Sequence, residues 1–141
     1  MRPSVISPND VQHTVTQGPP HILIVEDNEH VTNALQILLE TVPWRVTVAG
    51  SVGAALAVSR SDPPMVALLD LTLPDGDGLM LVEPLRTAGA KKIVVLTGHD
   101  DRETRQRCLD AGCAEVLIKP VSVRDLMDRS RGWLSELGAT A

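Results

Sequence analysis

The sequence contains no phenylalanine and no tyrosine, and Trp44 and Trp133 are its two tryptophans. A folded core must therefore be built from aliphatic side chains. Hydrophobic residues make up 43% of the 141 residues, an ordinary share for a globular protein. This length allows one domain with a substantial core and is too short for two domains of ordinary size.

Long apolar segments are also missing. Apolar runs such as Ile22–Val25 are far too short to cross a bilayer, and the N-terminus lacks the apolar segment of a signal peptide. The sequence therefore predicts a cytoplasmic protein with no membrane partner.

Cysteine and positive charge are both scarce. Cys108 and Cys113 are two cysteines without nearby histidines, which favours neither a disulfide framework nor a zinc site, so they are predicted to pack as small apolar residues. Thirteen basic residues stand against 18 acidic ones, a net charge of −5. A net negative charge does not attract the negatively charged backbone of nucleic acids, so no direct nucleic-acid partner is predicted.

The chain has two parts. Residues 1–20 contain four prolines and no sustained periodicity, which predicts a mobile N-terminal extension. From residue 21 to 138, five apolar strand segments alternate with five helical patterns. The predicted strands are His21–Glu26, Arg45–Val48, Met65–Asp70, Lys92–Gly98 and Glu115–Lys119. The predicted helices run from Val31 to Val42, onward from the cap Ser51, from Leu79 to Ala88, from Asp101 to Ala111, and from Ser122 to Leu137.

Such alternation predicts an α/β fold, a doubly wound five-stranded parallel sheet with helices on both faces. Pro84 lies inside the third helical pattern and is expected to weaken or kink that helix.

Polar residues follow four of the predicted strands. The first strand ends in Glu26 and Asp27, the third in Asp70, the fourth in Thr97 and the fifth in Lys119. In an open parallel sheet these ends meet at one edge, where ligands bind. Three clustered carboxylates repel one another, and a hard cation such as Mg²⁺ would relieve the repulsion. A metal, an ammonium group and a nucleophilic carboxylate are the parts that phosphoryl transfer requires.

Four segments, "ILIVEDN", "LLDLTLPDGDGL", "IVVLTG" and "VLIKP", resemble the receiver domain of two-component response regulators, a resemblance that covers about residues 21–138. It implies a flavodoxin-like (βα)5 fold, with Asp70 accepting a phosphoryl group from a sensor histidine kinase or a histidine phosphotransfer protein. It also implies Thr97 as a switch hydroxyl and Lys119 as the lysine that contacts the phosphate. The Mg²⁺ ligands that it implies are Glu26, Asp27, Asp70 and the backbone carbonyl of Thr72.

The same resemblance gives Thr72 and His99 a role in tuning the lifetime of the phosphoryl group, although His99 is equally interpreted as an exposed loop residue. The Lys119–Pro120 bond is expected to be cis. Val116 departs from the family, which usually has tyrosine or phenylalanine three residues before the lysine. The familiar coupling of threonine to a moving aromatic ring is therefore in doubt.

Four charged residues fall where receivers joined to winged-helix DNA-binding domains carry charges that bridge a dimer, namely Arg105, Glu115, Asp125 and Arg129. Their signs are complementary across a two-fold axis, so they form a candidate homodimer face over the fourth helix, fifth strand and fifth helix. The alternative is a local pair between Asp125 and Arg129, four residues apart on one exposed helix.

The function that follows is a phosphorylation-activated signalling switch that is no enzyme beyond its own phosphorylation and dephosphorylation, and that acts on a downstream protein. Because "GATA" ends the chain after Leu137, we expect either a stand-alone receiver or the receiver of a larger regulator, such as a transcriptional one.

The alternatives are a pseudo-receiver that binds proteins without phosphoryl transfer and a metal-dependent phosphohydrolase. A phosphohydrolase would need an acidic residue where Thr72 stands. Taken singly, Asp27 or Asn28 is also interpreted as a helix cap, Asp70 as a turn residue, Thr97 as a strand residue and Lys119 as a solvated charge.

Overall fold

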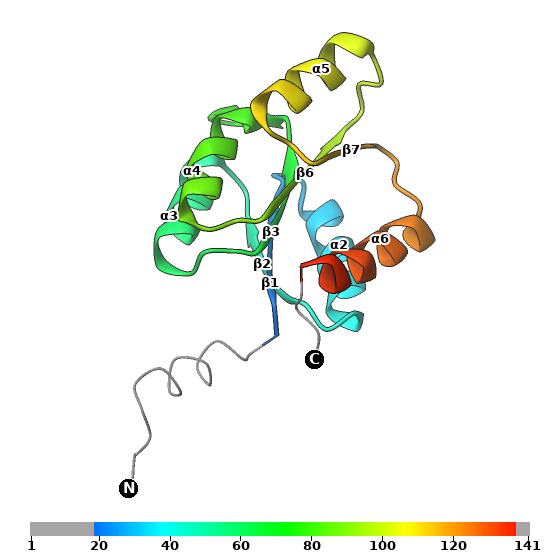
Figure 1. Ribbon diagram of the computed structural model, residues 1–141. Helices are drawn as coiled ribbons and strands as arrows, with labels where there is room; N and C mark the ends of the chain where they lie inside the picture. Colours follow the sequence, from blue (N-terminus) through cyan, green and yellow to red (C-terminus); the bar gives the residue numbers. More distant parts are fainter. Residues whose placement is uncertain (1–18, 138–141) are drawn as a thin grey trace, which may run out of the picture.

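The computed structural model describes residues 19–137 (Figure 1). Most of the predicted extension at residues 1–20 therefore lies outside the described residues. Within them, no helix is long and apolar enough to cross a bilayer.

A five-stranded parallel sheet forms the centre of the molecule, with the strand order β2-β1-β3-β6-β7. These strands are β1 (His21–Val25), β2 (Arg45–Ala49), β3 (Val66–Asp70), β6 (Lys92–Thr97) and β7 (Glu115–Ile118). The helices are α2 (Glu29–Thr41), α3 (Val52–Ser61), α4 (Val82–Ala88), α5 (Arg102–Ala111) and α6 (Val123–Glu136). The predicted α/β class and doubly wound arrangement are thus confirmed.

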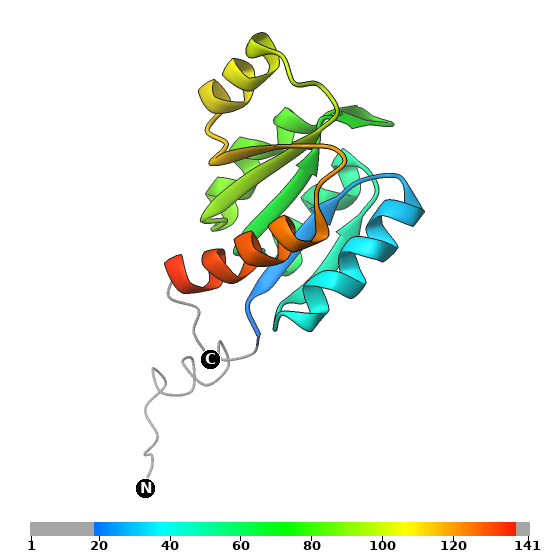
Figure 2. The same ribbon diagram turned by 90° about the vertical axis from the view of Figure 1, so that its right-hand side faces the viewer.

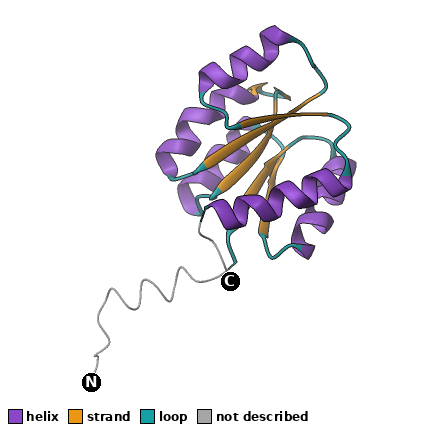
Figure 3. Cartoon of the chain, turned by 45° about the vertical axis from the view of Figure 1, so that its right-hand side comes forward, coloured by secondary structure: helices purple, strands orange, loops and turns teal. Residues whose placement is uncertain are grey.

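Helices cover both faces of the sheet (Figures 2 and 3). Leu35 and Leu39 of α2 pack with Leu126 and Trp133 of α6 in one apolar cluster. A second cluster on the other face contains side chains of α3, α4 and α5. Because both faces are covered, β1 is buried along its whole length, as its uninterrupted apolar run predicts.

A short antiparallel hairpin follows β3 and was not predicted. It pairs β4 (Thr72–Leu73) with β5 (Gly76–Asp77), and the 3₁₀ helix η1 (Gly78–Leu81) leads from it into α4. The segment predicted as one helix is therefore divided at Val82. Pro84 lies in the first turn of α4, where an α-helix has no partner for the missing N–H.

An ion-paired cluster closes the amino edge of the sheet, at the starts of β6 and β7. The buried Lys92 Nζ lies 3.2 Å from Glu115 Oε2 and 2.8 Å from Glu136 Oε1. The indole nitrogen of the buried Trp133 donates to Glu115 Oε2 at 2.9 Å. Burial by itself raises the pKa of Glu115, but the hydrogen bonds from Trp133 and Lys92 outweigh it and hold that pKa below its ordinary value.

His21 is a second buried polar residue at this edge. Its Nε2 lies 2.7 Å from Thr47 Oγ1, and its Nδ1 lies 3.4 Å from the Pro63 carbonyl oxygen. Burial lowers the pKa of His21 most strongly. The Pro63 carbonyl opposes this, the positive charge of Arg45 reinforces it, and Asp62 opposes it again, so that the net shift is downward.

This lowered pKa predicts a loss of stability in mild acid. The unfolded chain takes up the proton more readily than the native protein, so the free energy of unfolding should fall as the pH drops through about 6.5. One such proton gives a slope of up to ~1.4 kcal/mol per pH unit. Urea unfolding between about pH 7.5 and 5.5 should show a steeper decline for the wild type than for H21Q. The matched control H30Q removes an exposed histidine of α2 and should keep the wild-type slope; equal slopes for H21Q and the wild type would contradict the assignment.

Candidate functional site

Three carboxylates meet at the carboxyl edge of the sheet. Glu26 and Asp27 directly follow β1, and Asp70 is the last residue of the neighbouring strand β3. One oxygen of each carboxylate lies within 4.8 Å of the others. Glu26 is buried, Asp70 is half-buried and Asp27 is exposed, so the cluster opens to solvent on one side. Strand β1 ends at Val25, one residue earlier than predicted, so Glu26 lies in the loop directly after the strand.

Lys119 supplies the positive charge at this cluster. Its Nζ lies 2.8 Å from Glu26 Oε1 and 3.4 Å from Asp70 Oδ2. Partial burial lowers the pKa of Lys119 most strongly, but the hydrogen bond to Glu26 and the charge of Asp70 together raise it above its ordinary value. The lysine is therefore charged at neutral pH. The peptide bond from Lys119 to Pro120 is cis, as expected.

The donor set of the cluster fits a hard divalent cation. Three carboxylates stand against the single ammonium group of Lys119, and Mg²⁺ prefers such oxygen ligands while keeping several waters. Thr72, whose carbonyl is a predicted ligand, begins β4, and its amide donates to Asp70 Oδ1 at 3.3 Å. Its side chain is exposed, and a tuning role for it remains a prediction.

Thr97 reaches the same edge from β6, which pairs with β3. The residue is buried, and its Oγ1 accepts a hydrogen bond from the His99 amide at 3.1 Å. Its carbonyl oxygen accepts one from the Lys119 amide at 2.8 Å, so the backbone joins the predicted switch hydroxyl to the predicted phosphate-contacting lysine. His99 is exposed, which suits either interpretation given for it. Val116 packs, partly buried, against the apolar cluster beneath α5.

The four charges of the candidate homodimer face have partners within the chain. Arg129 lies 3.0 Å from Asp125 and 2.9 Å from Glu115, so the local pair along one helix is present. Arg105 lies 2.8 Å from Asp100 in the loop before α5. The homodimer itself stays a prediction.

Two acidic residues of the β4–β5 hairpin have partners that sequence reasoning missed. Asp75 accepts hydrogen bonds from the amides of Gly53 at 3.0 Å and Val52 at 2.8 Å, and these bonds lower its pKa. It thereby caps α3 from a distant part of the chain. Asp77 Oδ2 lies 2.6 Å from Arg107 of α5. The local signal "PDGDG" indicates a turn, but nothing in it identifies partners in other helices.

Gly78 packs directly against the backbone of Asp70. Its amide donates to the Leu71 carbonyl at 2.8 Å, and a Cβ atom at this position would overlap the Asp70 carbonyl oxygen. Only glycine fits such a close approach of two backbone segments.

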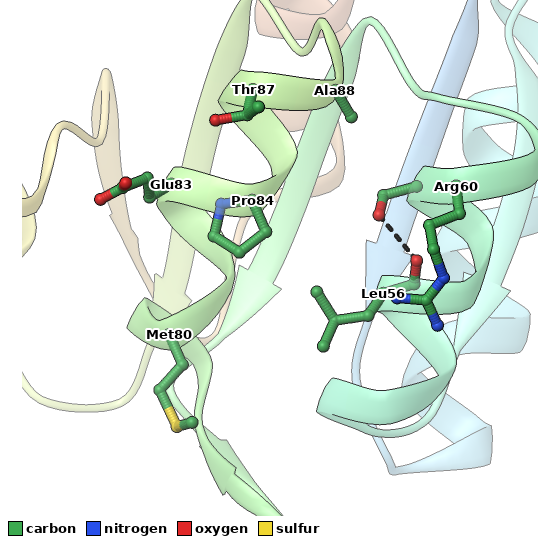
Figure 4. A pocket seen from close by; sticks show the side chains of 8 residues that line it. Leu56, Arg60, Met80, Glu83, Pro84, Thr87 and Ala88 are labelled. Carbon is green, nitrogen blue, oxygen red and sulfur yellow. Dashed lines mark hydrogen bonds between the residues drawn. The ribbon is translucent and has the colours of Figure 1, made fainter.

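A separate open pocket of about 570 Å³ lies between α3 and the η1–α4 segment (Figure 4). Leu56 and Arg60 approach it from α3, and Met80 and Pro84 face them from the other side. None of the acidic site residues contributes to its lining.

The sequence of this chain is similar to sequences of known response regulators. Residues 22–131 match the family described as the response regulator receiver domain. The KDP operon transcriptional regulatory protein KdpE of Escherichia coli K12 is 33% identical over 120 residues, which are 85% of this chain and 53% of KdpE. The chain spans about half the length of the curated relatives it matches.

The fold is also similar to those of solved receiver domains. A CheY-like response regulator receiver domain from Methanospirillum hungatei JF-1 superposes with a TM-score of 0.77 at 31% identity, covering 84% of this chain and 95% of that one. The receiver domain of the sensor histidine kinase PA1611 from Pseudomonas aeruginosa PAO1 superposes with a TM-score of 0.73 at 26% identity, covering 83% and 98%. That structure is described with a magnesium ion coordinated in its active site cleft.

Proposed function

The chain belongs to the response regulator receiver domain family, and from this premise we propose that it is a phosphorylation-activated switch whose phosphoacceptor is Asp70. The donor is the phosphohistidine of a sensor histidine kinase or of a histidine phosphotransfer protein. The single observation that carries the proposal is the convergence of three carboxylates and Lys119 at one edge of the sheet.

The chemistry assigned to Asp70 is a direct transfer. A carboxylate oxygen forms the new bond to phosphorus while the bond from phosphorus to the histidine nitrogen breaks, and the imidazole leaves with that electron pair. Lys119 Nζ, already 3.4 Å from Asp70 Oδ2, would offset the negative charge of the transferred group. The buried Thr97 hydroxyl is the second group near this oxygen-rich edge and would donate a hydrogen bond to it.

Mg²⁺ is the cofactor that we propose for this step. Glu26, Asp27 and Asp70 would hold it, together with the Thr72 carbonyl. When bound, the ion would neutralise charge on the phosphoryl oxygens. Support comes from the donor chemistry of this chain and from the magnesium ion described for the Pseudomonas aeruginosa receiver.

The switch acts on itself and then on a partner. Its chemical product is the phosphorylated Asp70 of the same molecule, so we propose no turnover of a separate substrate beyond the phosphodonor. A downstream protein would recognise the phosphorylated form. Because KdpE is named a transcriptional regulatory protein, control of transcription through a longer polypeptide is the output that this relative suggests.

The test is phosphorylation with a small acyl phosphate in the presence of Mg²⁺. Intact mass should show one phosphoryl group per chain, fragmentation should place it on Asp70, and a chelator should prevent it. An exposed acidic residue such as Asp110 should stay unmodified in the same sample. An unmodified chain with every acyl phosphate and with a phosphorylated histidine kinase would overturn the proposal and favour a pseudo-receiver that only binds proteins.

A further inference from the structure

Helix α5 is attached to the sheet by few apolar side chains. Cys108 is the one buried side chain among the ten residues of α5 that the structure describes. By contrast, α6 buries Leu126, Ser130 and Trp133. Figure 2 shows α5, in yellow, projecting from the body of the molecule. A helix with so little buried surface changes position at a low cost in free energy.

An ion pair joins this helix to the hairpin after Asp70. Arg107 of α5 donates to Asp77 Oδ2 at 2.6 Å, and the two side chains are about half exposed. The other carboxylate oxygen, Asp77 Oδ1, accepts from the Leu79 amide at 2.9 Å. The aspartate is therefore fixed at the start of η1 and presents its second oxygen to α5.

The backbone of Asp77 and of its neighbour Gly78 contacts the segment that carries the proposed phosphoacceptor Asp70. Asp77 pairs with Thr72 in the hairpin, and the Thr72 amide donates to Asp70 Oδ1 at 3.3 Å. The next residue, Gly78, packs against the Asp70 carbonyl and donates to the Leu71 carbonyl at 2.8 Å. The backbone of Asp77 is therefore connected through the hairpin and Gly78 to the segment that carries Asp70.

From these contacts we infer that Asp77 and Arg107 are positioning residues that couple the Asp70 loop to the placement of α5. The pair holds α5 against the hairpin in the unphosphorylated protein and transmits a displacement of the Asp70 loop to this helix. The part that concerns phosphorylation rests on the proposed function, whereas the restraint on α5 does not. An exposed pair stabilises by at most ~1 kcal/mol, which corresponds to an effect of up to about fivefold.

Hydrogen exchange of the amides in residues 102–111 tests the inference on the whole chain, with and without acyl phosphate and Mg²⁺. R107Q removes the cation, and D77N removes the anion while keeping an oxygen that can accept from Leu79. R102Q is the matched control, because it removes an exposed arginine from the first position of the same helix.

Without phosphodonor, R107Q and D77N should each speed exchange in α5 by about two- to fivefold, and R102Q should not. The double variant should exchange no faster than either single variant, because both remove the same contact. With phosphodonor, the change in α5 exchange seen in the wild type should shrink in R107Q and D77N.

Exchange in R107Q equal to that in R102Q would overturn the inference, and so would additive effects in the double variant or an undiminished response to phosphorylation. A wild type that takes up no phosphoryl group would instead contradict the proposed function. In that case the unphosphorylated samples still decide whether the pair restrains α5.

Discussion

Changing Asp70 to asparagine is expected to abolish phosphorylation by acyl phosphates and by any histidine kinase. The amide has nearly the same shape as the carboxylate but lacks the anionic oxygen that attacks phosphorus. It also removes one of three carboxylates that share the site, so Mg²⁺ affinity should fall on the order of tenfold. Intact mass and a calorimetric titration with Mg²⁺ measure the two effects.

The fold should survive this change. Lys119 keeps its 2.8 Å contact with Glu26, and the loss of one anion relieves repulsion within the cluster. The unfolding temperature of D70N without metal should therefore stay close to that of the wild type. D100N is the control, since it removes an exposed carboxylate from the loop after β6 and should leave both phosphorylation and Mg²⁺ binding intact. A phosphoryl group on D70N would show that another residue is the acceptor.

The second large effect is expected for Gly78→Ala. A Cβ atom here would overlap the Asp70 carbonyl oxygen, so two backbone segments must separate. Overpacking of this kind costs about 3 kcal/mol, which lowers the unfolding temperature on the order of 10 °C. Because the displaced segment carries Asp70, the proposed acceptor, the rate of phosphorylation should also fall, by about a hundredfold for a shift near 1 Å.

Thermal unfolding and the phosphorylation rate are measured side by side. The control is G50A, since a Cβ at Gly50 meets nothing within 4 Å. Equal unfolding temperatures for G78A and G50A would show that the loop relaxes without strain. A destabilised G78A that is phosphorylated at the wild-type rate would show that the close approach serves folding alone.

The strands and the location of the site could be predicted from the sequence, because the strands depend on hydrophobic periodicity and the site on the residues that follow each strand. Short apolar or alternating segments identified the strands, and the residues directly after them identified the edge where Glu26, Asp70 and Lys119 meet. Topology alone makes this inference reliable, because parallel strands deliver their carboxyl ends to one side of the sheet. The division of the third helix was missed because a 3₁₀ turn and a first helical turn share the same apolar spacing.

Contacts between charged residues far apart in the chain could not be predicted. Asp77 meets Arg107 across 30 residues, and Asp75 meets Val52 across 23. The charge pattern did not distinguish ion pairs within the chain from ion pairs to a second copy of the chain. In the structure, Arg129 contacts Asp125 and Glu115 of its own chain. Such pairings are decided by tertiary geometry, which exposed charges do little to determine.

The two edges of the sheet contain different groups of polar residues. The network of Lys92, Glu115 and Trp133 closes the amino edge, while the acidic site occupies the carboxyl edge. Substitutions at distant positions without shared partners combine additively. Substitutions of Lys92 or Trp133 are therefore expected to change the thermal stability of the fold and to leave the geometry of the acidic site unchanged.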